Sequence, residues 1–172
     1  KHALTWYDEV KEKDLIPQER LEFLYTKAYS LLEMKKYAEA KKIFNSLSNE
    51  KNEYSNVATY YSAYIDYLQK NNKSALNGFL KIEETEEYKD IVPYYIVQIY
   101  YEEKEYKKSL EHGKKMLESN PNNKNNSEVY RIMGECAYRE NVFNEAIVYF
   151  GKYEKLAKKL QRNSSYMYGM SF

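Results

Sequence analysis

The chain is poor in the residues that make tight turns and covalent cross-links. Its 172 residues include only 5 Gly, 3 Pro and 1 Cys. So few turn-forming residues exclude an all-β fold built from many hairpins. The single thiol, Cys136, cannot form an internal disulfide, so cysteine usage does not indicate a compartment. Because Cys136 lies in an apolar context, we expect it to be a buried structural residue rather than a catalytic nucleophile.

An excess of charge of one sign is also missing. The 27 basic and 26 acidic residues give a net charge of +1. Proteins that bind phosphate backbones usually carry a clear basic excess or patch, so we expect no nucleic-acid partner. No apolar run approaches the ~20 residues that a membrane span needs. Because the chain begins at Lys1 without a Met, we interpret it as a fragment of a longer protein. It therefore gives no information about the targeting signals of that protein.

Residues suited to catalysis or metal binding are sparse. The two histidines, His2 and His112, have no Cys or His partner at metal-ligand spacing. The acidic run Glu83-Glu84 with Glu86-Glu87 lacks the regularly spaced Asp, Asn and Gly residues of a calcium-binding loop. No nucleophile lies beside a base and an orienting group in a recognisable pattern. We therefore expect no enzyme activity, no metal and no cofactor.

What is present is an internal repeat. From Ala28, a second small residue follows after twelve positions at Ala40, and Phe44 follows four later. The same spacing recurs from Ala63, from Gly134 and, more weakly, from Val97. These starting positions differ by 63 − 28 = 35, 97 − 63 = 34 and 134 − 97 = 37 residues. A period of this size indicates a repeat architecture. The three further copies are Ala63, Ala75 and Phe79; Gly134, Ala146 and Phe150; and Val97, Ser109 and Gly113.

Each repeat reads as two amphipathic helices, because apolar residues recur at spacings of three and four. The sequence predicts helices over Gln18–Glu33 and Tyr37–Leu47, and second helices over Asn72–Ile82, Tyr106–Leu117 and Phe143–Leu160. Links of two or three residues make the two helices of a pair antiparallel. We expect one array over 1–172, divided into a truncated repeat (1–14), four repeats (18–50, 54–87, 89–121 and 126–161) and the start of another (163–172).

These spacings resemble the tetratricopeptide family, whose repeat of about 34 residues places Ala and Phe four apart and often ends with Pro. The segment 91–101, IVPYYIVQIYY, also resembles repeats of long tetratricopeptide proteins from Bacteroidetes-type bacteria. The resemblance implies an all-α fold, a right-handed superhelix of antiparallel helix pairs. It also implies packing roles at the repeat positions. The expected packing residues are Ala28, Ala40, Phe44, Ala63, Ala75, Phe79, Gly134, Ala146 and Phe150.

In the family, the first helix of each pair lines a concave groove that binds peptides. When the groove positions of the family are carried over by register, they imply a groove that contains eight tyrosines. Tyrosine is common at interfaces because its broad ring carries one hydroxyl. The same tyrosines can instead pack between the helices, and both roles, groove binding and packing, stay open. Arg131 and Arg139 are expected to be available for a carboxylate of the partner. The expected groove residues are Tyr25, Tyr29, Tyr60, Tyr64, Tyr67, Tyr94, Gln98, Tyr101, Arg131, Glu135 and Tyr138.

The sequence thus favours a protein-interaction scaffold that binds a peptide or a partner protein on a Tyr-rich groove. The first alternative is a structural spacer or self-assembly segment, with end-to-end association through apolar ends near Trp6, Tyr7, Tyr168 and Phe172. A remote alternative is an RNA-binding helical repeat, against which the near-zero net charge argues. The bacterial resemblance favours the cell envelope or periplasm, with the cytoplasm as the alternative location.

Overall fold

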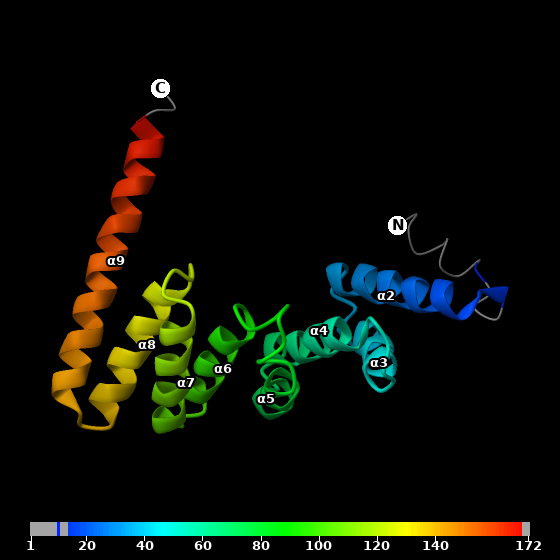
Figure 1. The fold of residues 1–172 in the computed structure, drawn as a ribbon, viewed down its shortest axis with the longest axis horizontal. Coiled ribbons are helices and arrows are strands. Elements are labelled where there is room, and N and C mark those ends of the chain that lie inside the picture. The colour runs from blue at the N-terminus through cyan, green and yellow to red at the C-terminus, as the bar shows by residue number, and fades with distance from the viewer. Residues whose placement is uncertain (1–9, 11–13, 170–172) are drawn as a thin grey trace. The chain divides into compact units, whose positions relative to one another are not determined.

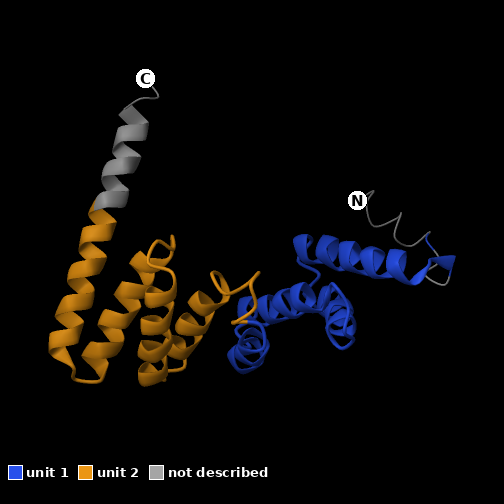
Figure 2. Ribbon diagram, in the orientation of Figure 1, with its two compact units in different colours: residues 1–82 blue, residues 83–172 orange. Residues whose placement is uncertain are grey.

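The computed structural model describes residue 10 and residues 14–169, with side chains through residue 158, and this part of the chain is all-helical. Its eight helices, α2 to α9, follow one another in consecutive pairs (Figure 1). The contacts divide the chain into two compact units, residues 1–82 and residues 83–172 (Figure 2). The prediction of helical hairpins is therefore confirmed, and each unit contains two of them.

The first unit holds two helical hairpins. Helices α2 (Pro17–Glu33) and α3 (Tyr37–Ser48) form the first hairpin, and α4 (Ser55–Leu68) and α5 (Asn72–Leu80) form the second. Pro17 occupies the first turn of α2, where its missing N–H costs no helical hydrogen bond. Helix α3 packs against both α2 and α4. The buried cluster between them includes Ala28, Ala40, Phe44 and Ile65.

The second unit repeats this arrangement. Helices α6 (Val92–Glu102) and α7 (Tyr106–Ser119) form one hairpin, and α8 (Asn126–Arg139) and α9 (Phe143–Gly169) form the other. Helix α7 contacts α8, and α6 also contacts α8 directly. One buried cluster contains Val97, Ile132 and Cys136, and a second contains Met116, Val129 and Met133. The contact of α6 with α8 brings the first helices of the two hairpins together, which positions the candidate site described below.

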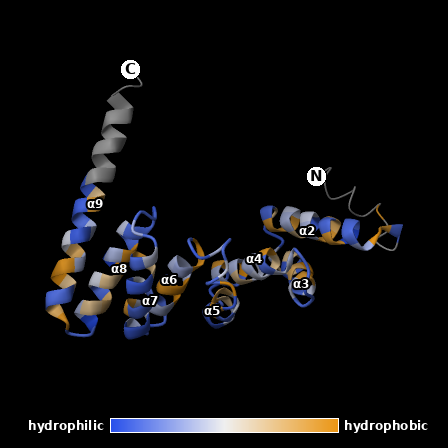
Figure 3. Cartoon of the chain, viewed as in Figure 1, coloured by the Kyte–Doolittle hydropathy of each residue, from blue (hydrophilic) through white to orange (hydrophobic). Residues whose placement is uncertain are grey.

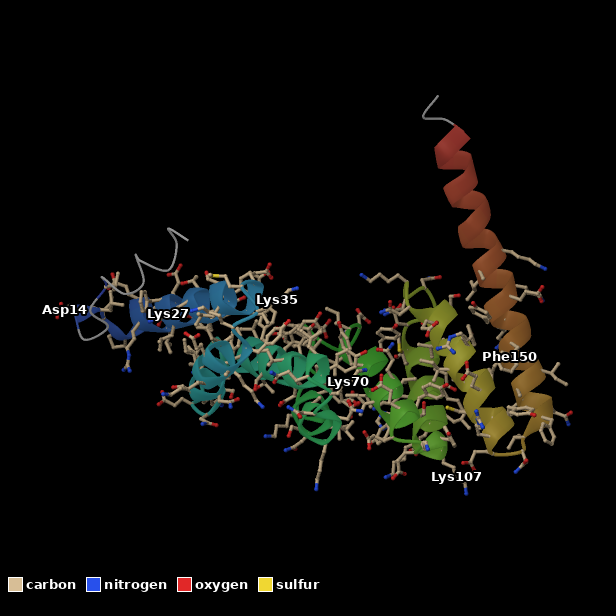
Figure 4. The ribbon with its side chains drawn as sticks, turned by 180° about the vertical axis from the view of Figure 1, so that it is seen from behind. Asp14, Lys27, Lys35, Lys70, Lys107 and Phe150 are labelled. Atoms are coloured by element: carbon tan, nitrogen blue, oxygen red, sulfur yellow. The ribbon has the colours of Figure 1, made fainter. Side chains whose placement is uncertain are left out.

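The link inside each hairpin has one backbone conformation, repeated four times. Lys35 has a φ of 59°, in the left-handed region, and its N–H donates to the carbonyl of Leu32 at 2.8 Å. The N–H of Lys36 then donates to the carbonyl of Leu31 at 2.9 Å. This pair of bonds is the Schellman ending of a helix. It recurs where Lys70, Lys104 and Asn141 have φ values of 60°, 61° and 61°; Figure 4 labels Lys35 and Lys70.

Small residues let paired helices approach closely. A Cβ atom added to Gly78 of α5 would lie 2.7 Å from the Cβ of Ala63 of α4. Ala63 itself is 2% exposed, and Ala28, Ala40 and Ala75 are fully buried. In the second unit, Gly134 of α8 lies directly against the ring of Phe150. The contact between hairpin helices thus depends on side chains no larger than a methyl group at these positions.

The expected packing phenylalanines differ in burial. Phe44 and Phe79 are fully buried in the first unit, whereas Phe150 is 38% exposed in the second. The Phe150 ring lies against Gly134, and Figure 4 labels the residue on α9. Ala146, one turn earlier, is 3% exposed. In the described residues, Phe150 therefore fills space within its own hairpin and keeps part of its ring uncovered.

Two helix ends differ from the sequence-based expectation. Helix α5 ends at Leu80, two residues before the predicted Ile82, because turns begin at Lys81. Helix α9 continues to Gly169 instead of ending at Leu160. The sequence has no Pro or Gly between Lys152 and Tyr168, so nothing interrupts the helical hydrogen bonds there. The division into a fourth repeat over 126–161 and the start of another over 163–172 stays a prediction, and the expected truncated repeat at 1–14 lies almost wholly outside the described residues.

Candidate protein-binding faces

A ladder of tyrosine rings runs over the first helices of the first unit. Tyr25 and Tyr29 come from α2, one helical turn apart, and their ring centroids are 6.4 Å apart. Tyr60, Tyr64 and Tyr67 come from α4 at spacings of four and three, which places them on one helix face. The rings of Tyr60 and Tyr64 stack at 6.0 Å, and those of Tyr64 and Tyr67 at 6.4 Å. This ladder is partly open to solvent, and Tyr29 is 39% exposed.

Tyr61 joins the two halves of the ladder. Its ring lies 5.4 Å from Tyr29 of α2 and 5.2 Å from Tyr60 of its own helix. It also stacks on Phe44 of α3 at 5.3 Å, which anchors the ladder to the buried core. Sequence register did not place Tyr61 in the groove. Of the neighbouring pair, Tyr60 stacks along the ladder on Tyr64, whereas Tyr61 packs between helices on Phe44.

The second unit presents a polar network in the corresponding place. On α6, the side-chain amide of Gln98 donates to the hydroxyl oxygen of Tyr94 at 3.0 Å. The hydroxyl of Tyr101, from the same helix, donates to a carboxylate oxygen of Glu135 on α8. Because α6 and α8 are first helices of their hairpins, this contact joins the predicted groove positions of the third and fourth repeats. The structure thus brings together Tyr94, Gln98, Tyr101 and Glu135.

Arg131 lies between two carboxylates on α8. Its Nε and Nη2 atoms donate to the two oxygens of Glu128 at 3.0 and 2.6 Å, a bidentate arrangement. Its Nη1 atom donates to Glu135 on the next turn. About a third of each of these three side chains is exposed. Two carboxylates of the chain thus already pair with Arg131, and its availability for a partner's carboxylate stays a prediction.

The network shifts the proton affinity of its members. The hydrogen bond to Glu135, followed by burial, raises the pKa of Tyr101 above its usual 10.0. The hydrogen bond to Glu128 raises the pKa of Arg131, so the guanidinium stays charged. Burial, with a smaller contribution from Glu128, raises the pKa of Tyr94. The tyrosines therefore present neutral hydroxyls at physiological pH, beside one positive and two negative side chains.

Tyr138, the last predicted groove residue, lies toward the end of α8. It is 59% exposed, and its ring meets that of Phe143 at 5.6 Å in an edge-on arrangement. Phe143 begins α9 and is itself 52% exposed. The pair forms an exposed aromatic corner at the link of the last hairpin. It is not part of the hydrogen-bonded network around Arg131.

Metal binding, membrane insertion and thiol chemistry were the other possibilities, and each concerns specific residues of the described part of the chain. Residue 10 and residues 14–169 contain no group of three or more His, Cys, Asp or Glu side chains able to hold a metal ion. None of the described helices is long and apolar enough to cross a membrane. Cys136 is fully buried, and burial raises the pKa of its thiol. A protonated, enclosed thiol is a poor nucleophile.

Comparison with solved structures identifies the fold. MamA superposes with a TM-score of 0.71 at 18% identity, over 90% of this chain and 81% of that one. RapI, in its apo form, gives 0.71 at 22% identity, over 93% of this chain and 62% of that one. Residues 41 to the end of MamA from Desulfovibrio magneticus RS-1 give 0.67 at 18% identity, over 81% and 76%. The chain has the tetratricopeptide fold.

Likeness at this identity concerns the fold alone. No family model matches the sequence, and no curated protein matches it. The resemblance to Bacteroidetes repeats, and the cell-envelope location that it implied, therefore stay predictions. The tetratricopeptide fold generally mediates protein binding. The two faces described above are therefore candidate binding faces.

Proposed function

We propose that the chain is a protein-interaction scaffold that binds a peptide or partner protein on the Tyr-rich groove faces of its first helices, α2 and α4 in one unit and α6 and α8 in the other. The observation that carries the proposal is the partly exposed ladder of Tyr60, Tyr64 and Tyr67, whose rings stack in a row at 6.0 and 6.4 Å. Tyrosine is enriched at interfaces because it supplies broad contact area and a polar tip at a small entropic cost.

The ladder suits a partner better than it suits packing alone. Rings that serve only the core are normally enclosed, as Phe44 and Phe79 are. The ladder rings are instead partly exposed, and they are held by stacking on one another and by the contact of Tyr60 with Tyr61, which stacks on Phe44. A row fixed in this way is preorganised, so a partner loses little free energy in ordering it.

The test is a selection of binding peptides from a random display library against the whole chain, followed by affinity measurement. Replacement of Tyr60 and Tyr64 together by Ala is expected to weaken selected peptides by about tenfold or more, as truncation of interface tyrosines does. Tyr153→Ala, a half-buried tyrosine on α9, is the matched control and should leave affinity unchanged. Circular dichroism verifies folding of each variant. Failure to select any peptide, or equal loss in the control, contradicts the proposal.

A second candidate function, self-association, is favoured by an apolar stripe on α9. Ile147 is 70% exposed, Val148 53% and Phe143 52%, and Figure 3 shows apolar colouring near the start of this helix. Phe143, Ile147 and Phe150 lie at spacings of four and three, hence on one face. Single exposed apolar residues are ordinary, but a contiguous row on one helix is typical of an interaction site.

Self-association is tested by light scattering across a range of protein concentrations. If α9 joins copies of the chain, the average mass rises with concentration, and Ile147→Asp returns the protein to a monomer. Lys152→Gln, at an exposed polar position on the same helix, lowers the net charge by the same one unit and is the control. A constant monomer mass in the wild-type chain eliminates this candidate and leaves the scaffold proposal intact.

A further inference from the structure

We infer that the face of α6 and α8 in the second unit selects a basic side chain, Lys or Arg, of the partner polypeptide. The inference deepens the proposed function and rests on it. It starts from the charges of this face: Glu128 and Glu135 carry two negative charges, and Arg131 between them carries one positive charge. The centre of the face therefore has a net charge of −1.

The carboxylates keep room for another donor. Each oxygen of Glu128 accepts one bond from Arg131, and the oxygens of Glu135 accept one bond each, from Arg131 and Tyr101. A carboxylate offers about four acceptor positions, so about two remain on each side chain. Both side chains are about a third exposed, at 37% and 32%, so a partner can reach these positions.

Arg131 is poorly placed to select an acidic side chain. Three of its N–H groups already donate to carboxylates of the chain, and the two flanking carboxylates would repel an approaching carboxylate. A basic side chain meets the opposite situation, because both flanking carboxylates attract it. Arg131 then acts as a spacer that holds the two carboxylates in fixed positions.

Aromatic rings border the same place. Tyr101 donates its hydroxyl to Glu135, which fixes the ring beside the carboxylate, and Tyr94 lies on the same face of α6, where its hydroxyl accepts from Gln98. Both rings are partly exposed. Ring faces attract cations, and carboxylates beside rings strengthen that attraction. The combination of two carboxylates and two tyrosine rings fits a guanidinium or ammonium group on an extended segment.

The test uses the ¹⁵N-labelled chain and three small probes: the N-acetyl amides of arginine, glutamine and glutamate. Titration with the arginine probe is expected to give saturable shifts of backbone amides in 94–101 and 128–138, larger than those caused by the glutamine probe. Glu135→Gln and Glu128→Gln should each weaken binding of the arginine probe about threefold, the size expected for an exposed charged contact. Glu118→Gln, an exposed residue of α7, makes the same charge change elsewhere and should have no effect.

The double variant Glu128→Gln/Glu135→Gln sharpens the test, since it changes the local charge from −1 to +1. We expect it to lose the arginine probe and to gain the glutamate probe. Preference of the wild-type chain for the glutamate probe, or unchanged arginine binding in both single variants, overturns the inference. Peptides selected through the tyrosine ladder would still bind in that case, so failure of this inference is distinguishable from failure of the proposed function.

Discussion

The hydroxyl of Ser109 donates a hydrogen bond of 3.0 Å to the backbone carbonyl of Val97, on the partner helix of its hairpin. Ser109 is fully buried, and the repeat register places it where Ala40 and Ala146 stand in other hairpins. The hydroxyl fits there because the helix beside it supplies an acceptor. The weakest copy of the repeat thus compensates for its departure with a buried interhelical bond.

Replacement of Ser109 by Ala should lower the free energy of unfolding by about 1 kcal/mol, because a buried hydrogen bond is lost without a change in packing. Ser109→Val should cost more, since the larger side chain must fit between two close helices. Urea unfolding followed by circular dichroism measures both. A Ser109→Ala variant more stable than the wild type would contradict the role assigned to the bond.

Two glycine positions are expected to respond in opposite directions to the same change. Gly78→Ala places a methyl group 2.7 Å from the Cβ of Ala63, so the two helices must separate, and we expect a loss of about 1–3 kcal/mol. Gly151 has no atom within 4 Å of an added Cβ. Gly151→Ala should therefore gain up to about 1 kcal/mol from helix propensity. Thermal unfolding of the pair checks the contrast, and equal effects would contradict the close approach of α4 and α5.

The left-handed lysines offer a third prediction. Lys35 and Lys104 have φ values near 60°, which costs an L-residue about 1 kcal/mol and costs glycine almost nothing. Lys35→Gly and Lys104→Gly should each stabilise the chain by about 0.5–1 kcal/mol. Lys42→Gly is the control, because Lys42 lies exposed inside α3, where glycine should destabilise by about 1 kcal/mol. Denaturant midpoints that shift the same way in all three variants would contradict the turn conformation.

Burial predicts the ranking of the repeat phenylalanines. Phe44 is fully buried between α2, α3 and α4, so Phe44→Ala should cost about 3–5 kcal/mol. Phe150 is 38% exposed, and Phe150→Ala should cost less. Chemical unfolding gives both values. An unchanged midpoint for Phe44→Ala would contradict the repeat register from which the packing roles were inferred.

Alkaline titration tests the Tyr101–Glu135 bond. Because the bond raises the pKa of Tyr101 above 10.0, the folded state holds the hydroxyl proton more tightly than the unfolded state. The resulting stability is present below pH 10 and is lost as the pH rises through the raised pKa. Glu135→Ala should lower the pKa of Tyr101, followed by the ¹³Cζ resonance of its ring, while Glu118→Ala should not. A Tyr101 pKa that Glu135→Ala leaves in place would show that the bond does not form.

The helical hairpins could be predicted from sequence because the spacing of Ala28, Ala40 and Phe44 depends on local helix geometry. Predicted and observed ends agree to within two residues for α2, α3, α5 and α7. The left-handed links could not be predicted as such. Lysine at positions 35 and 104 does not predict a positive φ, because the residue usually found at this position is Gly.

The faces were only partly predictable. Register carried over from the family placed Tyr101 and Glu135 among the expected groove residues, but it did not predict the hydrogen bond between them. Which oxygen pairs with Arg131, however, depends on side-chain choices among several nearby charges. The sequence suggested an available arginine, whereas Glu128 and Glu135 occupy it. Tyr61 was missed because its direction depends on the packing of α3 against α4, which no single-helix pattern contains.

The enclosure of Cys136 has a practical consequence. It is the only thiol in the sequence and is fully buried in the second unit. A maleimide or disulfide reagent can reach it only when α8 separates from its neighbours, so the modification rate in native buffer reports how often that half of the protein opens. Any cysteine introduced at the surface would, by the same property, be the sole fast-reacting attachment point for a dye or spin label.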